Sequence, residues 1–256
     1  MSQALFSLEG RTALVTGASG GLGGTFARAA AQAGARVVLA ARQTERVREL
    51  EAALRDAGAE VKALEMDVGE PLSVERAFAR LEADGWLVDV VVNNAGLGLN
   101  QSWLRTDEAT WTKLLQTNLL GADRVARAAC TRLIAAGRAG TVINIASVLG
   151  LTVQPVSAAY GATKAALIHL TKKMAIEMAR HRITVNCIAP GMFRTAMVEE
   201  FARSPRGHAY LEQALSRRMG EPDELVGTLL YLAGAASSYV TGVVIPVDGG
   251  NHLRSL

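Results

Sequence analysis

The chain has 256 residues, half of them apolar, and a formal net charge of +3 at neutral pH. This length suits one large α/β domain, and no linker, repeat or low-complexity tract divides it. Basic residues are spread among acidic ones and aromatic residues make up only 5% of the chain, which argues against a nucleic-acid-binding surface.

The amino-terminal segment MSQALFSLEGR lacks the cationic start and long apolar run of an export signal, and no stretch approaches 18 apolar residues. We therefore expect a cytoplasmic protein that does not contact a membrane. The two cysteines, Cys130 and Cys187, lie in apolar surroundings, which indicates buried free thiols. We expect no bound metal.

The first predicted strand, residues 11–16, runs into a glycine-rich turn and then a helix over residues 24–33. This order is typical of the phosphate-binding start of a dinucleotide fold, because backbone N–H groups can approach a pyrophosphate and the helix N-terminus favours its charge. A turn without a ligand could share the sequence, but the flanking strand and helix favour cofactor binding. The expected contacts are Gly17, Ser19, Gly20, Gly21, Leu22 and Gly23.

The end of the second predicted strand, residues 36–41, decides which nicotinamide cofactor is favoured. An acidic residue there would bind the adenosine ribose 2′-OH, whereas an arginine accommodates a 2′-phosphate. The chain has Ala41 and then Arg42, with no carboxylate before Glu45. We therefore favour NADP(H) over NAD(H), although Arg42 could also be a solvated residue ahead of the helix predicted over 44–57.

A third strand is predicted over 61–66, a helix over 71–83 and a fourth strand over 88–92. Asp67, at a strand end, could hold the adenine amino group or cap the next helix. The fourth strand runs into Asn93-Asn94-Ala95-Gly96, where amides beside small residues suit both a turn and close contact with a flat ring.

One long helix is predicted over 107–136, with Asn118 near its middle. Asparagine is disfavoured inside a helix because its amide competes with the backbone, so we expect a local task for it. Residues 141–146 form the fifth predicted strand, and Ser147 follows at its carboxyl end, where open α/β sheets bind ligands.

Tyr160 and Lys164 stand four residues apart in a helix predicted over about 157–180, so their side chains share one face. Lowering a tyrosine pKa from about 10 to about 7 requires roughly 4 kcal/mol. An ammonium about 5 Å away at an effective dielectric near 20 supplies roughly 3 kcal/mol. The helix dipole adds about 0.3 to 1 kcal/mol if Ser157 is the N-cap. The pair therefore predicts a tyrosine that exchanges a proton near neutral pH.

A sixth strand is predicted over 182–189, ending at Pro190-Gly191, then a helix over 222–233 and a last strand over 243–247. The uneven stretch 192–218 suggests a substrate lid, with a surface helix as the alternative. Seven strands alternating with helices predict a Rossmann-type, doubly wound parallel sheet with helices on both faces. The expected substrate pocket, which is mostly apolar, consists of Ser147, Leu149, Gln154, Tyr160, Met192, Phe193 and Met197.

Together these features resemble the short-chain dehydrogenase/reductase family over nearly the whole chain. The resemblance rests on Thr16-Gly17-x-x-x-Gly21-x-Gly23, Asn93-Asn94-Ala95-Gly96, Asn118, Ser147, Tyr160-x-x-x-Lys164 and Pro190-Gly191. It implies that Tyr160 is the general acid in ketone reduction and the base in alcohol oxidation. It further implies that Lys164 binds the nicotinamide ribose and lowers the tyrosine pKa, that Ser147 binds the substrate oxygen, and that Asn118 anchors a water.

The resemblance also implies further cofactor contacts, at Asp67, Val68, Asn94, Ala95, Gly96, Pro190, Gly191, Met192 and Thr195. One departure is Gly20, where NADP-dependent members often carry a basic residue. Family members are commonly homotetramers joined through the two long helices and the last strand.

The expected activity is an NADP(H)-dependent interconversion of a ketone and a secondary alcohol. A 3-oxoacyl thioester reductase and an NAD-dependent alcohol dehydrogenase are the closer alternatives. A non-catalytic dinucleotide sensor and a sugar-nucleotide epimerase or dehydratase are more remote.

Overall fold

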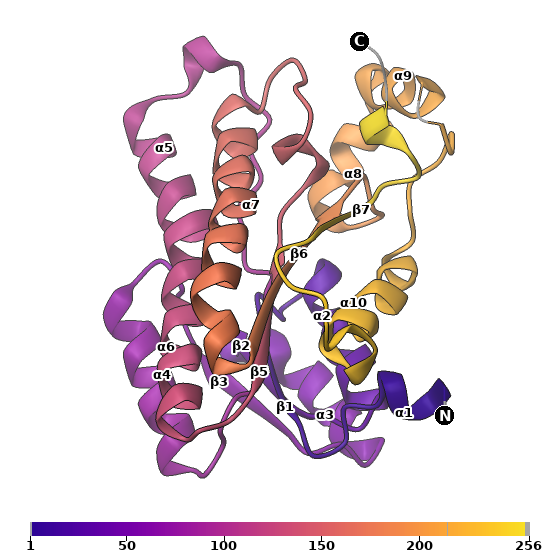
Figure 1. Cartoon of the computed structure of the whole chain (residues 1–256). Coiled ribbons are helices and arrows are strands. Elements are labelled where there is room, and N and C mark those ends of the chain that lie inside the picture. Colours follow the sequence, from indigo (N-terminus) through magenta and orange to yellow (C-terminus); the bar gives the residue numbers. More distant parts are fainter. Residues whose placement is uncertain (1, 214, 254–256) are drawn as a thin grey trace.

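A computed structural model describes residues 2–213 and 215–253 and contains one seven-stranded sheet (Figure 1). Every neighbouring pair is parallel, in the order β3-β2-β1-β4-β5-β6-β7. Because β1 and β4 are neighbours and the chain winds outward on either side of them, a crevice forms at their carboxyl ends. The predicted fold is confirmed. The strands are β1 Thr12–Thr16, β2 Arg36–Ala41, β3 Val61–Glu65, β4 Val90–Asn93, β5 Gly140–Ile145, β6 Ile183–Pro190 and β7 Val244–Val247.

Helices cover both faces of the sheet (Figure 1). One face packs against α2 (Gly21–Gln32), α3 (Arg48–Asp56) and α10 (Val226–Ala233), and the other against α4 (Pro71–Ala83), α6 (Gly121–Ala135) and α7 (Ala158–Met178). The short α1 (Ser2–Phe6) lies near α10, and α5 (Glu108–Leu115) leads into α6. Two helices, α8 (Ala196–Arg203) and α9 (Pro205–Gln213), stand apart beyond the carboxyl ends of the strands.

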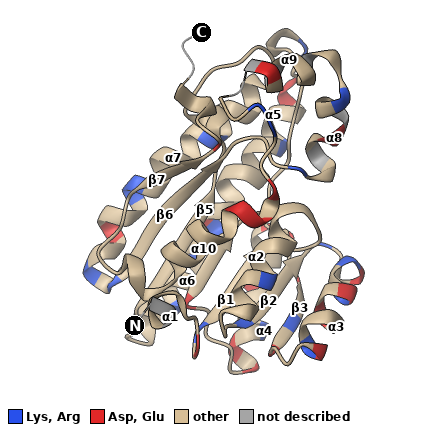
Figure 2. Ribbon diagram, turned by 90° about the vertical axis from the view of Figure 1, so that its right-hand side faces the viewer, with Lys and Arg blue, Asp and Glu red and all other residues tan. Residues whose placement is uncertain are grey.

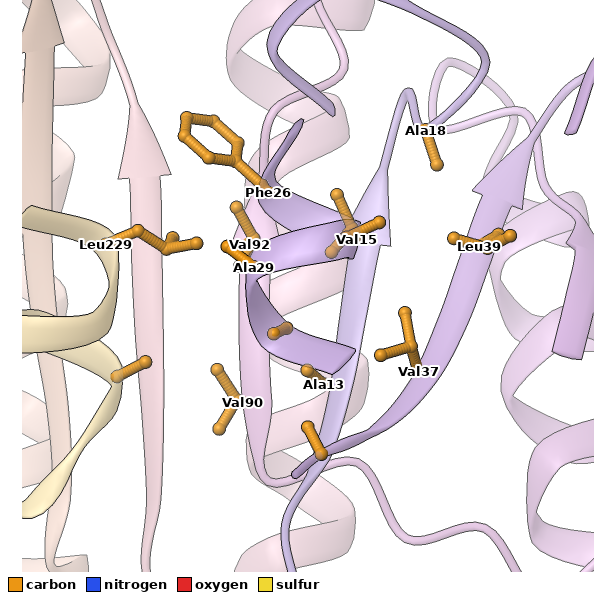
Figure 3. Packing of buried hydrophobic residues seen from close by; sticks show 14 of the residues in the cluster. Ala13, Val15, Ala18, Phe26, Ala29, Val37, Leu39, Val90, Val92 and Leu229 are labelled. Atoms are coloured by element: carbon orange, nitrogen blue, oxygen red, sulfur yellow. The ribbon is translucent and has the colours of Figure 1, made fainter. Parts of the chain in front are cut away.

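The core follows from strand alternation, because successive side chains of a strand point to opposite faces. Val15, Leu39 and Val92 pack with Phe26 of α2 in one cluster, which also takes in Leu229 of α10 (Figure 3). Their neighbours in sequence, such as Leu14, Val38 and Val91, pack on the other face. Since both faces are buried, the strands are apolar throughout, which is why they could be recognised in the sequence.

Two elements differ from the prediction. The helix predicted over 107–136 contains a π-helical turn at Gln116–Leu120 between α5 and α6. Ser157 does precede α7, but its backbone is left-handed (φ 62°) and its side chain makes no capping hydrogen bond. Among the described residues, no helix combines the length and the apolarity needed to cross a membrane.

Candidate active site

The glycine-rich turn is a close-packed cradle at the carboxyl end of β1. Gly17 and Gly21 have φ of 65° and 55°, a conformation that suits glycine. A Cβ on Gly23 would lie 2.3 Å from the Gly17 carbonyl oxygen, so α2 starts directly against the turn. No side chain caps the start of α2, which leaves its first N–H groups available to an anion.

Thr16 and Asn94 fasten this turn to the end of β4. The Thr16 hydroxyl accepts hydrogen bonds from the backbone N–H groups of Asn94 and Ala95, both at 3.0 Å. The Asn94 amide donates to the carbonyl oxygens of Thr16 (3.0 Å) and Gly17 (3.3 Å). The Asn94 side-chain nitrogen, predicted to lie beside the adenine ribose, is therefore engaged in holding the turn. Sequence analysis gave Thr16 no separate role, although a hydroxyl residue at a strand end is a visible signal.

Arg42 follows β2 on the adenosine side of the turn and is exposed. In the described part of the chain it makes no hydrogen bond or ion pair. The nearest acidic residue in sequence, Glu45, lies 3.6 Å from Arg48. The Arg42 guanidinium is therefore free to meet a phosphate.

Asp67 and Val68 follow β3, where an adenine ring was expected. One Asp67 oxygen accepts a hydrogen bond from the Gly69 N–H at 2.8 Å, so the carboxylate braces its own turn. It does not cap α4, whose N-cap is Glu70. Val68 is buried against Gly121, where a Cβ would come within 2.8 Å of the valine.

The structure brings Ser147, Tyr160 and Lys164 together beside the turn. Ser147 follows β5, and its hydroxyl lies close enough to the Tyr160 phenol to influence the pKa of that group. The Lys164 ammonium lies 5.7 Å from the centre of the Tyr160 ring and donates to the Ile145 carbonyl oxygen at 2.8 Å. It also lies 3.5 Å from the position that a Cβ on Gly96 would take, so it faces the loop after β4.

The electrostatics of this pair differ from the prediction. Burial raises the pKa of Tyr160, and the nearby Ser147 hydroxyl only partly opposes that effect. Burial also lowers the pKa of Lys164 to about 8. The expectation of a tyrosine pKa near 7 was wrong for the cofactor-free chain, because it counted the attraction of the ammonium but not the cost of removing a phenolate from water.

Asn118 lies in the π-helical turn and is 1% exposed. Its side chain accepts from the Leu97 N–H (2.7 Å) and donates to the Leu97 carbonyl (3.0 Å) and to the Thr163 hydroxyl (3.2 Å). The task expected of an asparagine at this place is thus to tie the loop after β4 to α7. Thr163, which sequence analysis missed, stands directly before Lys164 and donates to the Tyr160 carbonyl at 2.7 Å.

The predicted substrate pocket is only partly assembled by the structure. Leu149, Gln154 and Met192 are half-buried. Leu149 and Gln154 follow Ser147 closely in the sequence, and Met192 lies just beyond the end of β6. Phe193 is 5% exposed and packs in the hydrophobic core with its ring against Gly220, and its place in the substrate pocket stays a prediction. Met197 lies on α8, but its side chain falls outside the described part of the structure. Pro190 ends β6 and Gly191 follows it, with Asp248 packed on Gly191. Thr195 is the N-cap of α8 and lies near Gly21.

These residues fit a nicotinamide dinucleotide. The glycine cradle excludes side chains where a pyrophosphate would bind, and the Lys164 ammonium has one protein acceptor in the described structure although it carries three donors. A family model described as Enoyl-(Acyl carrier protein) reductase matches residues 17–252.

Two curated relatives match along nearly their whole length. The chain is 36% identical to gluconate 5-dehydrogenase of Gluconobacter oxydans, over 96% of each chain. It is 34% identical to 3-oxoacyl-[acyl-carrier-protein] reductase of Vibrio cholerae, over 96% of this chain and 99% of that protein. A crystal structure of a gluconate 5-dehydrogenase from Burkholderia cenocepacia, in complex with NADP and tartrate, superposes with a TM-score of 0.95 at 36% identity, over 100% of both chains. With the sheet order, the glycine cradle and the Ser147–Tyr160–Lys164 cluster, these matches show that the chain belongs to the short-chain dehydrogenase/reductase family.

Proposed function

We propose that this protein is an NADP(H)-dependent oxidoreductase that interconverts a ketone and a secondary alcohol. The observation that carries the proposal is the cluster of Ser147, Tyr160 and Lys164 at the strand ends, beside a glycine cradle shaped for a dinucleotide. When bound, the nicotinamide supplies or accepts the hydride. The protein supplies orientation and the proton.

In this mechanism Ser147 and Tyr160 bind the substrate oxygen with their two hydroxyl groups. In reduction the Tyr160 hydroxyl gives its proton to that oxygen, and in oxidation the phenolate takes a proton from the alcohol. Lys164 stabilises the phenolate and offers its remaining N–H groups to ribose hydroxyls. Asn118 fixes the loop that contains Gly96, opposite the ammonium.

Replacing Tyr160 with phenylalanine tests this assignment. We expect Y160F to lose turnover while its NADPH affinity, measured by fluorescence titration, stays within about threefold of wild type. Y231F, which changes a half-buried tyrosine of α10, is the matched control and should keep its activity. Substantial turnover by Y160F would refute the role of Tyr160.

The choice of NADP(H) over NAD(H) is supported by Arg42 after β2, which pairs with no side chain of residues 2–213 and 215–253, and by the NADP in the Burkholderia cenocepacia relative. A 2′-phosphate pairs well with a guanidinium. We expect R42A to lower kcat/KM for NADPH at least tenfold and to leave kcat/KM for NADH within about twofold. A wild-type preference for NADH would overturn this part of the proposal.

For the substrate we propose a small ketone or its alcohol, with a 3-oxoacyl thioester as the second candidate. The relatives named above include a gluconate dehydrogenase and a 3-oxoacyl-[acyl-carrier-protein] reductase, so both classes need testing. Arg194 is an exposed cation that could contact an acidic carrier protein, but it is paired with Glu221 at 2.9 Å, and this weakens the thioester case. Assays of gluconate with NADP and of a 3-oxoacyl thioester with NADPH, beside a panel of apolar ketones, would separate the candidates.

We further propose a homotetramer located in the cytoplasm. Apolar side chains are exposed along the two long helices, including Leu115 (36%), Ile134 (39%) and Ile176 (74%), and the side chains of the edge strand β7 are only half-buried. Exposed apolar surface of this kind favours association. Light scattering after size exclusion tests the assembly. The two free, buried thiols suit a reducing compartment.

A further inference from the structure

The segment that carries α8 and α9 leaves the body of the protein and returns to it at a narrow neck. Arg194 N donates to Gly220 O and Gly220 N donates to Met192 O, both at 2.9 Å, so Phe193 and Gly220 form a short parallel bridge. The Phe193 ring lies on this bridge, since a Cβ on Gly220 would come within 2.6 Å of it. Both ends of the segment 195–219 are therefore held side by side.

Two exposed ion pairs lie at this neck. Arg194 Nε is 2.9 Å from Glu221 Oε1, and the Arg218 guanidinium contacts both oxygens of Glu224 at 2.7 Å. The glutamates form a capping box, in which each side chain accepts from the other's backbone N–H. Since the two pairs are joined in this way, we call Arg194, Arg218, Glu221 and Glu224 the neck clasp.

Beyond the neck, α8 and α9 are built as one unit that projects from the sheet (Figures 1 and 2). The Ser204 hydroxyl donates to Phe201 O at 2.6 Å and accepts from Gly207 N at 3.1 Å. The Gly207 backbone lies so close to the end of α8 that a Cβ there would be 2.0 Å from Phe201 O. Because the connection between α8 and α9 is this tightly packed, we expect the two helices to move together, with the change of angle at the neck.

The segment touches the cofactor side of the molecule at its start. Thr195 packs on Gly21 of the glycine turn, where a Cβ would lie 3.7 Å from the threonine methyl. At the other end, Leu215 and Ser216 pack on Gly250 and Gly249, where added Cβ atoms would approach to 2.8 and 2.5 Å. A change of angle at the neck would therefore move the α8–α9 unit relative to the glycine turn.

We propose that the neck clasp holds the α8–α9 unit at the angle at which it covers the bound substrate, so that Arg194 and Arg218 are positioning residues for substrate binding. This inference rests on the proposed function. The bidentate Arg218–Glu224 pair fixes direction as well as distance. Exposed ion pairs add little to the free energy of unfolding of a whole protein. The free energy of opening the neck alone is smaller, so a small change in it alters how often the α8–α9 unit opens.

The test uses the full-length double variant R194Q/R218Q, which removes both cations and leaves the capping box in place. Its matched control is R55Q/R80Q, which removes two exposed arginines outside this segment that are also ion-paired, with Glu51 and Asp84. E224Q provides an independent second variant at the neck. Amide hydrogen exchange of peptides from 196–213 is measured without ligand and with NADP, and KM and kcat are measured with the best substrate of the panel above.

We expect exchange in 196–213 to be at least threefold faster in R194Q/R218Q and in E224Q than in the control. KM for the substrate should rise threefold to tenfold, while kcat changes less than twofold. Exchange equal to that of the control would overturn the inference, and so would faster exchange with an unchanged KM. Hydrogen exchange is measured without turnover, so it tests the clasp even if the wild-type protein reduces no member of the panel. A wild-type protein without activity would contradict the proposed function and not the clasp.

Discussion

The buried charge of Lys164 should make the cofactor-free protein less stable than a variant without it, by an amount that depends on pH. The folded-state pKa of Lys164 is lowered from 10.5 to about 8, chiefly by burial. Between these values the unfolded chain binds more protons than the folded one, so wild-type stability gains with rising pH across this window. A shift of this size corresponds to about 3 kcal/mol.

The variant K164M removes the titrating group and keeps most of its volume. We expect the unfolding free energy of wild type, relative to K164M, to rise by about 3 kcal/mol between pH 7 and pH 10.5. Other groups titrate in both proteins and largely cancel. Urea unfolding curves at four pH values measure the difference, and K172M, an exposed lysine of the same helix, should run parallel to wild type. A difference that stays constant over this range would refute the desolvation argument.

Three further predictions concern the cradle, the tyrosine and the thiols. G23A should weaken NADPH binding at least tenfold in fluorescence titrations, because a Cβ there would lie 2.3 Å from Gly17 O, whereas G227A on α10, with nothing within 4 Å of the added Cβ, should bind normally. Since burial raises the pKa of Tyr160, alcohol oxidation should accelerate from pH 7 to 9 while ketone reduction changes little, and parallel pH profiles would contradict this. Burial raises the pKa of Cys130 and Cys187 to about 11 and about 12, so neither thiol should react with Ellman's reagent until urea unfolds the chain.

The sheet could be predicted because each strand is buried on both faces and therefore reads as a continuous apolar run. Residues 36–41 and 71–83 were predicted with the bounds that the structure gives to β2 and α4. Both are local patterns, an apolar strand in one case and a helix that opens with proline in the other. Recognition of the cradle was local as well, since Gly17 and Gly21 adopt the backbone conformation for which glycine is suited.

Features that depend on contacts between distant segments were not predictable in this way. The π-helical turn at Asn118 is accompanied by hydrogen bonds to Leu97 and Thr163, which no local pattern announces. Phe193 was predicted as a pocket residue, but its packing in the core against Gly220, far along the chain, could not be read from the local sequence. In both cases a partner remote in sequence decides the outcome.

The pKa values of Tyr160 and Lys164 could not be predicted from the sequence for a similar reason. Spacing along a helix fixes which groups meet, but their solvation depends on the whole fold. At neutral pH the phenol is protonated and the ammonium is charged, because burial raises the pKa of Tyr160 and leaves the lowered pKa of Lys164, about 8, above neutral pH. The attraction between them is realised only as the proton leaves the phenol for a substrate oxygen. An interaction that strengthens during the reaction lowers the barrier, whereas one already present in the resting state would not. Burial, which keeps the pKa of Tyr160 high, is therefore also what makes Tyr160 and Lys164 suited to ketone reduction.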